Sequence, residues 1–103
     1  MLVSKINKDE IITLKLVTGE EVITKIVENK EDCLIVSKPF AFIMQKVGPA
    51  MAPMFLSVDW EKEPITIYKS AITMMATPKA EFITGYNGVS SNIVTPPKPK
   101  IIT

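Results

Sequence analysis

The chain has 103 residues, one cysteine and no histidine, and its formal net charge is +1. This length is close to the commonest size of one domain and leaves no room for a second hydrophobic core. The lack of histidine excludes Ser/His/Asp and Cys/His catalysis and the common zinc sites. A net charge near zero excludes a global basic field that would attract nucleic acid. We therefore expect a binding or assembly module with no cofactor and no metal, and not an enzyme.

Apolar residues make up 47% of the chain, and the mean hydropathy of +0.23 is high for so short a protein. A small domain has a large surface relative to its volume, so part of this apolar surface should stay exposed in a monomer and favour a homo-oligomer. No stretch approaches the ~20 apolar residues that cross a bilayer. Charged residues crowd the first ten positions, where a signal peptide needs an apolar run. Together with the single cysteine, this predicts no membrane contact and a cytoplasmic location.

The first third of the chain predicts an antiparallel meander. Residues 1–10 are mixed and polar, which indicates an N-terminal arm that is either a short helix or loose. From residue 11 apolar and polar residues alternate, the period of a strand with one buried face. Gly19 lies in a tight turn, because glycine takes the positive φ that hairpin loops need. A second β-like run at 22–27 and a polar turn lead to a third strand at Cys33, whose thiol is expected to be buried and inert.

Pro39 interrupts the third strand, since proline has no N–H for a sheet ladder. The uncharged segment 47–54 contains two prolines and three residues with flexible or small side chains between them, and it predicts a loop. Methionine-rich loops suit partner proteins, so this loop is one candidate contact surface for a partner protein. Packing on its own sheet or on an adjacent subunit is the commoner alternative, and we favour it. The other expected strands are 40–44, 55–60, 65–68 and 72–76.

A change of chemistry at Thr77 closes the β domain expected at 11–77 and predicts a short helix at 78–88. Thr77 is a suitable N-cap and Pro78 a suitable first helical residue, while Gly88 can end the helix. An apolar stripe on this helix most simply packs into the core, and it consists of Phe82, Ile83 and Tyr86. Residues 89–103 are rich in proline and lysine and predict a flexible tail.

Two segments resemble the Sm, LSm and Hfq proteins. Residues 14–36 resemble the first Sm motif, which consists of a strand, a glycine turn, a strand, a short loop and a strand. Residues 68–73, Tyr-Lys-Ser-Ala-Ile-Thr, resemble the second Sm motif in its bacterial Hfq form. With the strands between them the two motifs cover most of residues 11–77. The chain is also similar to single-domain Sm-like proteins encoded by phages of marine bacteria, which would place it in the cytoplasm of a host cell.

The resemblance implies an all-β fold, a strongly bent five-stranded antiparallel Sm-like barrel, here followed by the short C-terminal helix. It also implies a closed ring in which the edge strands of neighbouring subunits pair. In such rings two loops face the pore and hold RNA or single-stranded DNA. On this sequence those loops contain Asn29 and Lys30 in one case, and Tyr68, Lys69 and Ser70 in the other.

The sequence departs from the family pattern at the positions that matter for binding. Asn29 and Lys30 stand where an aromatic–Asp pair is usual, Ser70 replaces the Hfq histidine, and Thr24 replaces a glycine that bends the second strand. Base stacking on an aromatic side chain supplies about 1–3 kcal/mol per base, so its loss predicts low sequence specificity, with the two lysines meeting phosphates. Tyr68 either stacks on a base or, more commonly for a strand tyrosine, packs. The alternative hypothesis is a structural or protein-interaction module with no nucleic-acid role.

Overall fold

The structure is a computed structural model that describes residues 6–91. It contains six strands, one 3-10 helix and one α-helix. The strands are β1 (Ile11–Leu16), β2 (Glu21–Asn29), β3 (Cys33–Gln45), β4 (Gly48–Pro53), β5 (Ile65–Tyr68) and β6 (Ile72–Ala76), with η2 (Lys69–Ala71) between the last two and α1 (Ala80–Ser91) after them. Residues 1–5 of the expected arm and 92–103 of the expected tail lie outside the described part.

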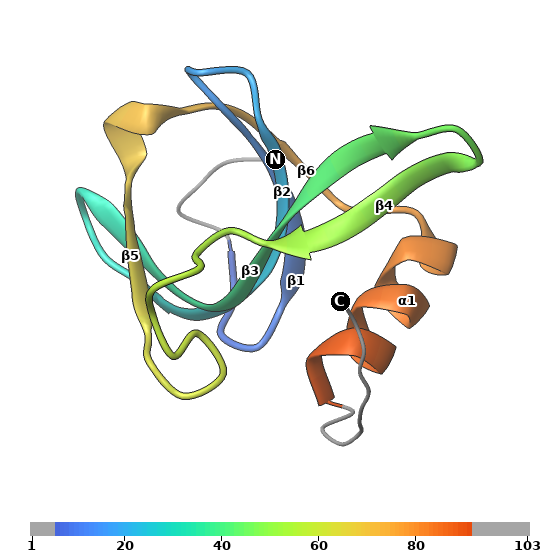
Figure 1. Cartoon of the computed structure of the whole chain (residues 1–103). Helices are drawn as coiled ribbons and strands as arrows, with labels where there is room; N and C mark the ends of the chain where they lie inside the picture. The colour runs from blue at the N-terminus through green and yellow to red at the C-terminus, as the bar shows by residue number, and fades with distance from the viewer. Residues whose placement is uncertain (1–5, 92–103) are drawn as a thin grey trace.

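The strands form one antiparallel sheet in the order β4-β3-β2-β1-β6, and β5 also pairs with β3. The predicted all-β fold with a short C-terminal helix is therefore confirmed at this level. Six strands are present where five were expected. Figure 1 shows the sheet curling round, with α1 beside it on the right. Within residues 6–91 no ladder joins β5 to β6, so the sheet is bent without being closed.

The bend has a defined origin in the middle of β3. The first part of this strand pairs with β5 and the last part with β4, and the change occurs around Lys38, whose φ of 52° is unusual for a residue with a side chain. The β2–β3 register also shifts beside Thr24. Thr24 is fully buried, and its hydroxyl donates to the Ser37 carbonyl across the irregularity at 2.9 Å. A hydroxyl thus satisfies the backbone where the sequence lacks the bending glycine.

The segment predicted as a loop at 47–54 is a strand, and that prediction is wrong. β4 pairs with the end of β3 from Gln45–Gly48 to Phe40–Pro53. Pro49 and Pro53 are four residues apart, so both nitrogens point to the same side of the strand. Because β4 lies at the edge of the sheet, prolines on its outer side remove no ladder bond. The segment therefore packs on its own sheet, the alternative that the sequence favoured.

Two other expected boundaries are wrong. Residues 55–60 form bends and a turn instead of a strand. The helix begins at Ala80 instead of 78 and passes through Gly88 to Ser91, where the Lys38 ammonium donates to the Ser90 carbonyl at 2.9 Å. A cation at the C-terminal carbonyls extends the helix past a glycine that the sequence alone marks as its end.

The side chains pack in two hydrophobic clusters on opposite faces of the strands. The inner cluster lies inside the bend and is aliphatic. Its buried members are Ile6, Ile12, Leu14, Ile26, Leu34 and Val36. The partly buried residues around them include Ile65, Ile67, Ile72 and Met75. Ile6 belongs to the expected arm, so the end of that arm is packed into the core.

The outer cluster lies between the sheet and α1 and is aromatic. Phe40 makes edge contacts with Trp60 and Tyr86, with ring centroids 5.1 and 5.7 Å apart, and Phe42 does so with Phe82 at 5.4 Å. The expected packing of the α1 stripe is confirmed for Phe82 and for Tyr86, which is 1% exposed. The Tyr86 hydroxyl lies 2.9 and 3.0 Å from the Ser37 and Lys38 carbonyls, so it fastens α1 to the bend of β3.

Candidate nucleic-acid interface

The β2–β3 turn presents the first predicted binding segment. The Lys30 N–H donates to the Cys33 carbonyl at 2.9 Å and closes the turn. Lys30 is exposed and Asn29 is half-buried at the end of β2. Cys33 itself is buried, as the sequence predicted, and makes no disulfide.

The second predicted segment begins at the end of β5 and continues into η2. Tyr68 pairs with Cys33 across the β3–β5 ladder, and the Lys69 N–H donates to the Asp32 carbonyl at 2.9 Å. Tyr68 is 62% exposed and Ser70 is exposed, whereas Lys69 is half-buried. The ring of Tyr68 therefore faces outward from the sheet and does not fill the core.

The Lys69 side chain joins the two segments. Its ammonium donates to the Lys30 carbonyl. The structure thus brings all five predicted residues into one region, although 38 positions separate Lys30 from Tyr68 along the chain. In Figure 1 the turn and η2 lie on the left of the molecule, away from α1.

The charge of this region differs from the sequence expectation. Glu31 and Asp32 are exposed in the same turn as Lys30, so two carboxylates stand beside two lysines. The Lys69 ammonium is engaged with a backbone carbonyl, which leaves Lys30 as the more accessible cation. The arrangement offers local phosphate contacts and one exposed aromatic ring without a broad basic surface.

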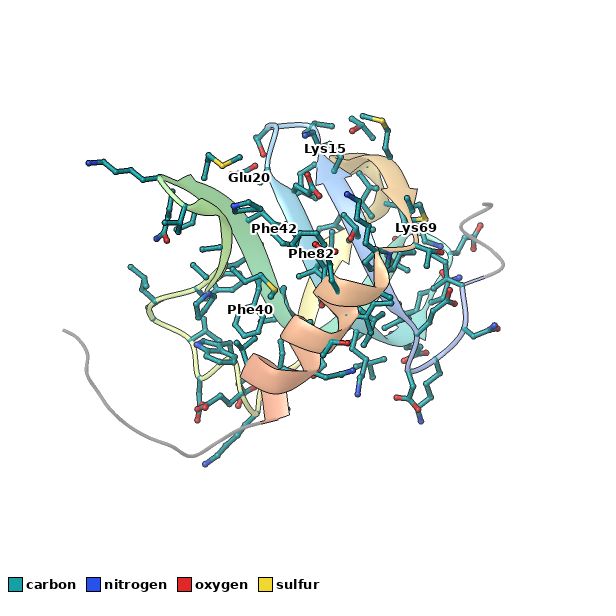
Figure 2. All side chains as sticks on the ribbon, turned by 90° about the vertical axis from the view of Figure 1, so that its right-hand side faces the viewer. Lys15, Glu20, Phe40, Phe42, Lys69 and Phe82 are labelled. Carbon is teal, nitrogen blue, oxygen red and sulfur yellow. The ribbon has the colours of Figure 1, made fainter. Side chains whose placement is uncertain are left out.

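A groove that the sequence did not reveal lies on the other side of the molecule. It holds about 580 Å³ between the end of β3, the β1–β2 turn and the β6–α1 connection. Figure 2 shows four side chains that line it, those of Lys15, Glu20, Phe42 and Phe82. These residues come from four separate elements, so no local motif announces the groove.

The described residues include no helix long and apolar enough to cross a membrane. Within the same residues no three His, Cys, Asp or Glu side chains are grouped in a way that could hold a metal ion. No protein-family model matches the chain, and no curated protein matches it either.

Proposed function

We propose that this chain is a Sm-like module that forms a ring and binds RNA or single-stranded DNA with low sequence specificity. The binding surface consists of Asn29, Lys30, Tyr68, Lys69 and Ser70. The observation that carries the proposal is the junction between the two segments, in which the Lys69 ammonium meets the Lys30 carbonyl. Two short segments that resemble Sm motifs are thereby brought side by side, as the binding loops of that family are.

The exposed ring of Tyr68 gives the surface its stacking group. Stacking on an aromatic ring tolerates every base, since each base has a π-face. Lys30 supplies an exposed ammonium for a phosphate, and Ser70 supplies a hydroxyl. The neighbouring Glu31 and Asp32 weaken the attraction for a polyanion, so a single chain should bind weakly.

A ring strengthens such a weak site by repeating it in every subunit. β5 and β6 each pair with one strand only, so each has an outer edge open to a second copy. The prolines of β4 have no N–H, so the outer edge of this strand offers few hydrogen-bond donors to a neighbouring strand. We assign the ring contact to β5 and β6, which pair with one strand each within residues 6–91. A head-to-tail contact of this kind gives a closed ring when the rotation between neighbouring subunits is a whole fraction of a turn.

The assembly is tested by light scattering after gel filtration at micromolar concentration. The protein should elute as one species of about four chains or more. A clean monomer would contradict the ring.

The binding surface is tested with labelled oligo(U), oligo(A) and oligo(dT) at two salt concentrations. Lys30→Ala should weaken all three by a similar factor and flatten the salt dependence, because each neutralised phosphate releases counterions. This variant keeps the backbone carbonyl that holds Lys69. Lys69→Ala should weaken binding at least as much, since it also loosens the junction.

Lys62→Ala is the matched control, because Lys62 is an exposed lysine in the β4–β5 connection. It should leave the affinity and the salt dependence unchanged. Wild-type protein that shows no salt-dependent binding would overturn the nucleic-acid proposal. The protein-interaction alternative would then be favoured by the exposed apolar side chains, which include Met44, Val47 and Leu56.

A further inference from the structure

The hairpin formed by the end of β3 and by β4 carries apolar side chains into solvent. Met44 is 79% exposed and Val47, in the turn, is 95% exposed, and Ile43 beside them is exposed as well. Single exposed apolar residues are normal on a protein surface, but three within five positions make a contiguous patch. Figure 1 shows this hairpin reaching past the rest of the sheet, above α1. Nothing in residues 6–91 covers its tip.

The same apolar surface continues into the groove beside α1. Met44 lines this groove together with the rings of Phe42 and Phe82. Exposed Met74 of β6 lies beside it, because Met74 pairs with Lys15, a groove residue, and opposite residues of an antiparallel pair point to the same face. Hairpin, groove and β6 thus form one continuous face, the groove face, which is turned toward the viewer in Figure 2.

A strand added to the edge of β4 is a poor way to cover this face. Pro49 and Pro53 lie on the outer side of β4 and have no N–H, so this edge offers few donors to a neighbouring strand. Proline on an edge strand is a common protection against edge-to-edge pairing. A partner of the groove face would therefore bind through side chains more than through backbone.

The groove carries charges of both signs in equal number. Lys15 and Lys79 line it together with two acidic residues, Glu20 and Glu21. The Thr18 hydroxyl donates to the Glu20 carboxylate and lowers its pKa, which keeps this group ionised at neutral pH. None of the four charges forms an ion pair within residues 6–91. All four are therefore available to a partner.

This balance of charge indicates which partner fits. A polyanion such as RNA would meet the two carboxylates and a basic segment would meet the two lysines, so neither suits the whole groove. A second copy of the chain suits it, because in a two-fold contact residue i of one copy faces residue j of the other, and j faces i. Each lysine–glutamate contact then forms twice, and both apolar hairpin tips are covered in the same step.

We propose that the groove face is a contact between two copies of this chain related by a two-fold axis. The β3–β4 hairpin of one copy lies over the groove of the other, and the two lysines of each groove face the two glutamates of the opposite one. The contact uses side-chain faces, whereas the ring contact uses the outer edges of β5 and β6. This proposal therefore goes beyond the proposed function and does not depend on it.

Charge reversal tests the contact without knowledge of which lysine meets which glutamate. Glu20→Lys/Glu21→Lys makes all four groove charges positive, and Lys15→Glu/Lys79→Glu makes all four negative. Each variant alone should repel its own copies and have half the wild-type mass in light scattering after gel filtration. An equimolar mixture of the two should recover the wild-type mass, because grooves of opposite charge then meet.

Unchanged mass in both variants would overturn the proposal and leave the groove to a partner other than a second copy. A mixture that stays at half the wild-type mass, or a monomeric wild-type protein, would overturn it as well. The factor of two does not depend on the ring size, so the result is separate from the test of the ring. Wild-type protein of two chains and no more would contradict the ring and support this contact.

The hairpin tip gives a second test that leaves the groove charges intact. Met44→Asp/Val47→Asp should halve the mass, because the tip can no longer be buried against the second copy. Leu56→Asp is the matched control, since Leu56 is fully exposed and does not line the groove. It should leave the mass unchanged. Equal losses in the two proteins, or no loss in the hairpin variant, would show that the hairpin does not lie between two copies.

Discussion

The inner and outer clusters occupy opposite faces of the same strands, yet different side chains build them. The inner cluster is made of aliphatic side chains, which need no hydrogen-bond partners to pack. The outer cluster joins aromatic rings from β3 and α1 and contains a buried hydroxyl that needs partners. In β2 the consecutive residues Val22, Ile23 and Thr24 are all fully buried, because both faces are covered there. We infer that the sheet supports itself, whereas α1 is fastened to it by a few specific contacts.

The largest expected effect is the difference in lost stability between a substitution in the inner cluster and one in the outer cluster. Leu34 is fully buried in the inner cluster, so Leu34→Ala should lower the free energy of unfolding by about 3 kcal/mol or more. Phe82 is half-buried in the outer cluster, so Phe82→Ala should cost about 1–2 kcal/mol. Urea denaturation measures both. A larger loss for Phe82→Ala would contradict the view that the sheet supports itself.

The second prediction uses pH, because the outer cluster contains a titratable group and the inner one does not. Burial raises the pKa of Tyr86 from 10.0 to about 12. The folded protein therefore holds this proton more tightly than the unfolded chain. The stabilisation is complete below pH 10 and is lost as the pH rises through 12, at about 1.4 kcal/mol per pH unit between them.

Tyr86→Phe is the control for this pH dependence. It should cost about 1–2 kcal/mol at neutral pH, since it removes the donor to two partly buried carbonyls. It should also remove the extra alkaline loss, measured as the difference between the two proteins from pH 9 to pH 12. Parallel stability curves over this range would show that folding does not raise the pKa of Tyr86.

The smallest effect tests how tightly α1 lies against β4. A Cβ at Gly88 would meet open space, whereas one at Gly85 would lie 3.1 Å from the Met51 methyl group. Gly88→Ala should therefore stabilise the protein by about 0.5–1 kcal/mol through helix propensity. Gly85→Ala should gain less, because Met51 must shift. Equal gains in thermal denaturation would mean that the outer cluster is loosely packed at this point.

The inner half of the fold could be predicted from sequence, since it follows local periodicity. The alternation in β1 placed Ile12 and Leu14 in the core, and the turn glycine, Gly19, has the expected positive φ of 103°. The prolines of β4 pointed to a loop, because the sequence does not say which side of a strand faces a neighbour. The end of α1 was misplaced for a similar reason, as the ammonium that extends it comes from Lys38, about 50 positions earlier.

The sequence selected the two segments of the candidate site, but it did not predict the charges and hydrogen bonds around them. The Sm resemblance selected both segments, and the structure brings them together through Lys69. The sequence could not show that this ammonium is engaged by a carbonyl, since that depends on how η2 meets the β2–β3 turn. The groove beside α1 was missed entirely, because it forms where β3 extends beyond the end of its ladder with β2.

The central claim is that Tyr68 and its neighbours form one surface for single-stranded nucleic acid. Photo-cross-linking of an oligonucleotide that contains 5-iodouracil, followed by mass spectrometry of the peptides, tests it most directly. The exposed ring of Tyr68 should carry the main adduct, and Tyr68→Leu should abolish that adduct while the protein stays folded. Adducts concentrated on Trp60 or Phe55, or none at all in wild-type protein, would contradict the claim.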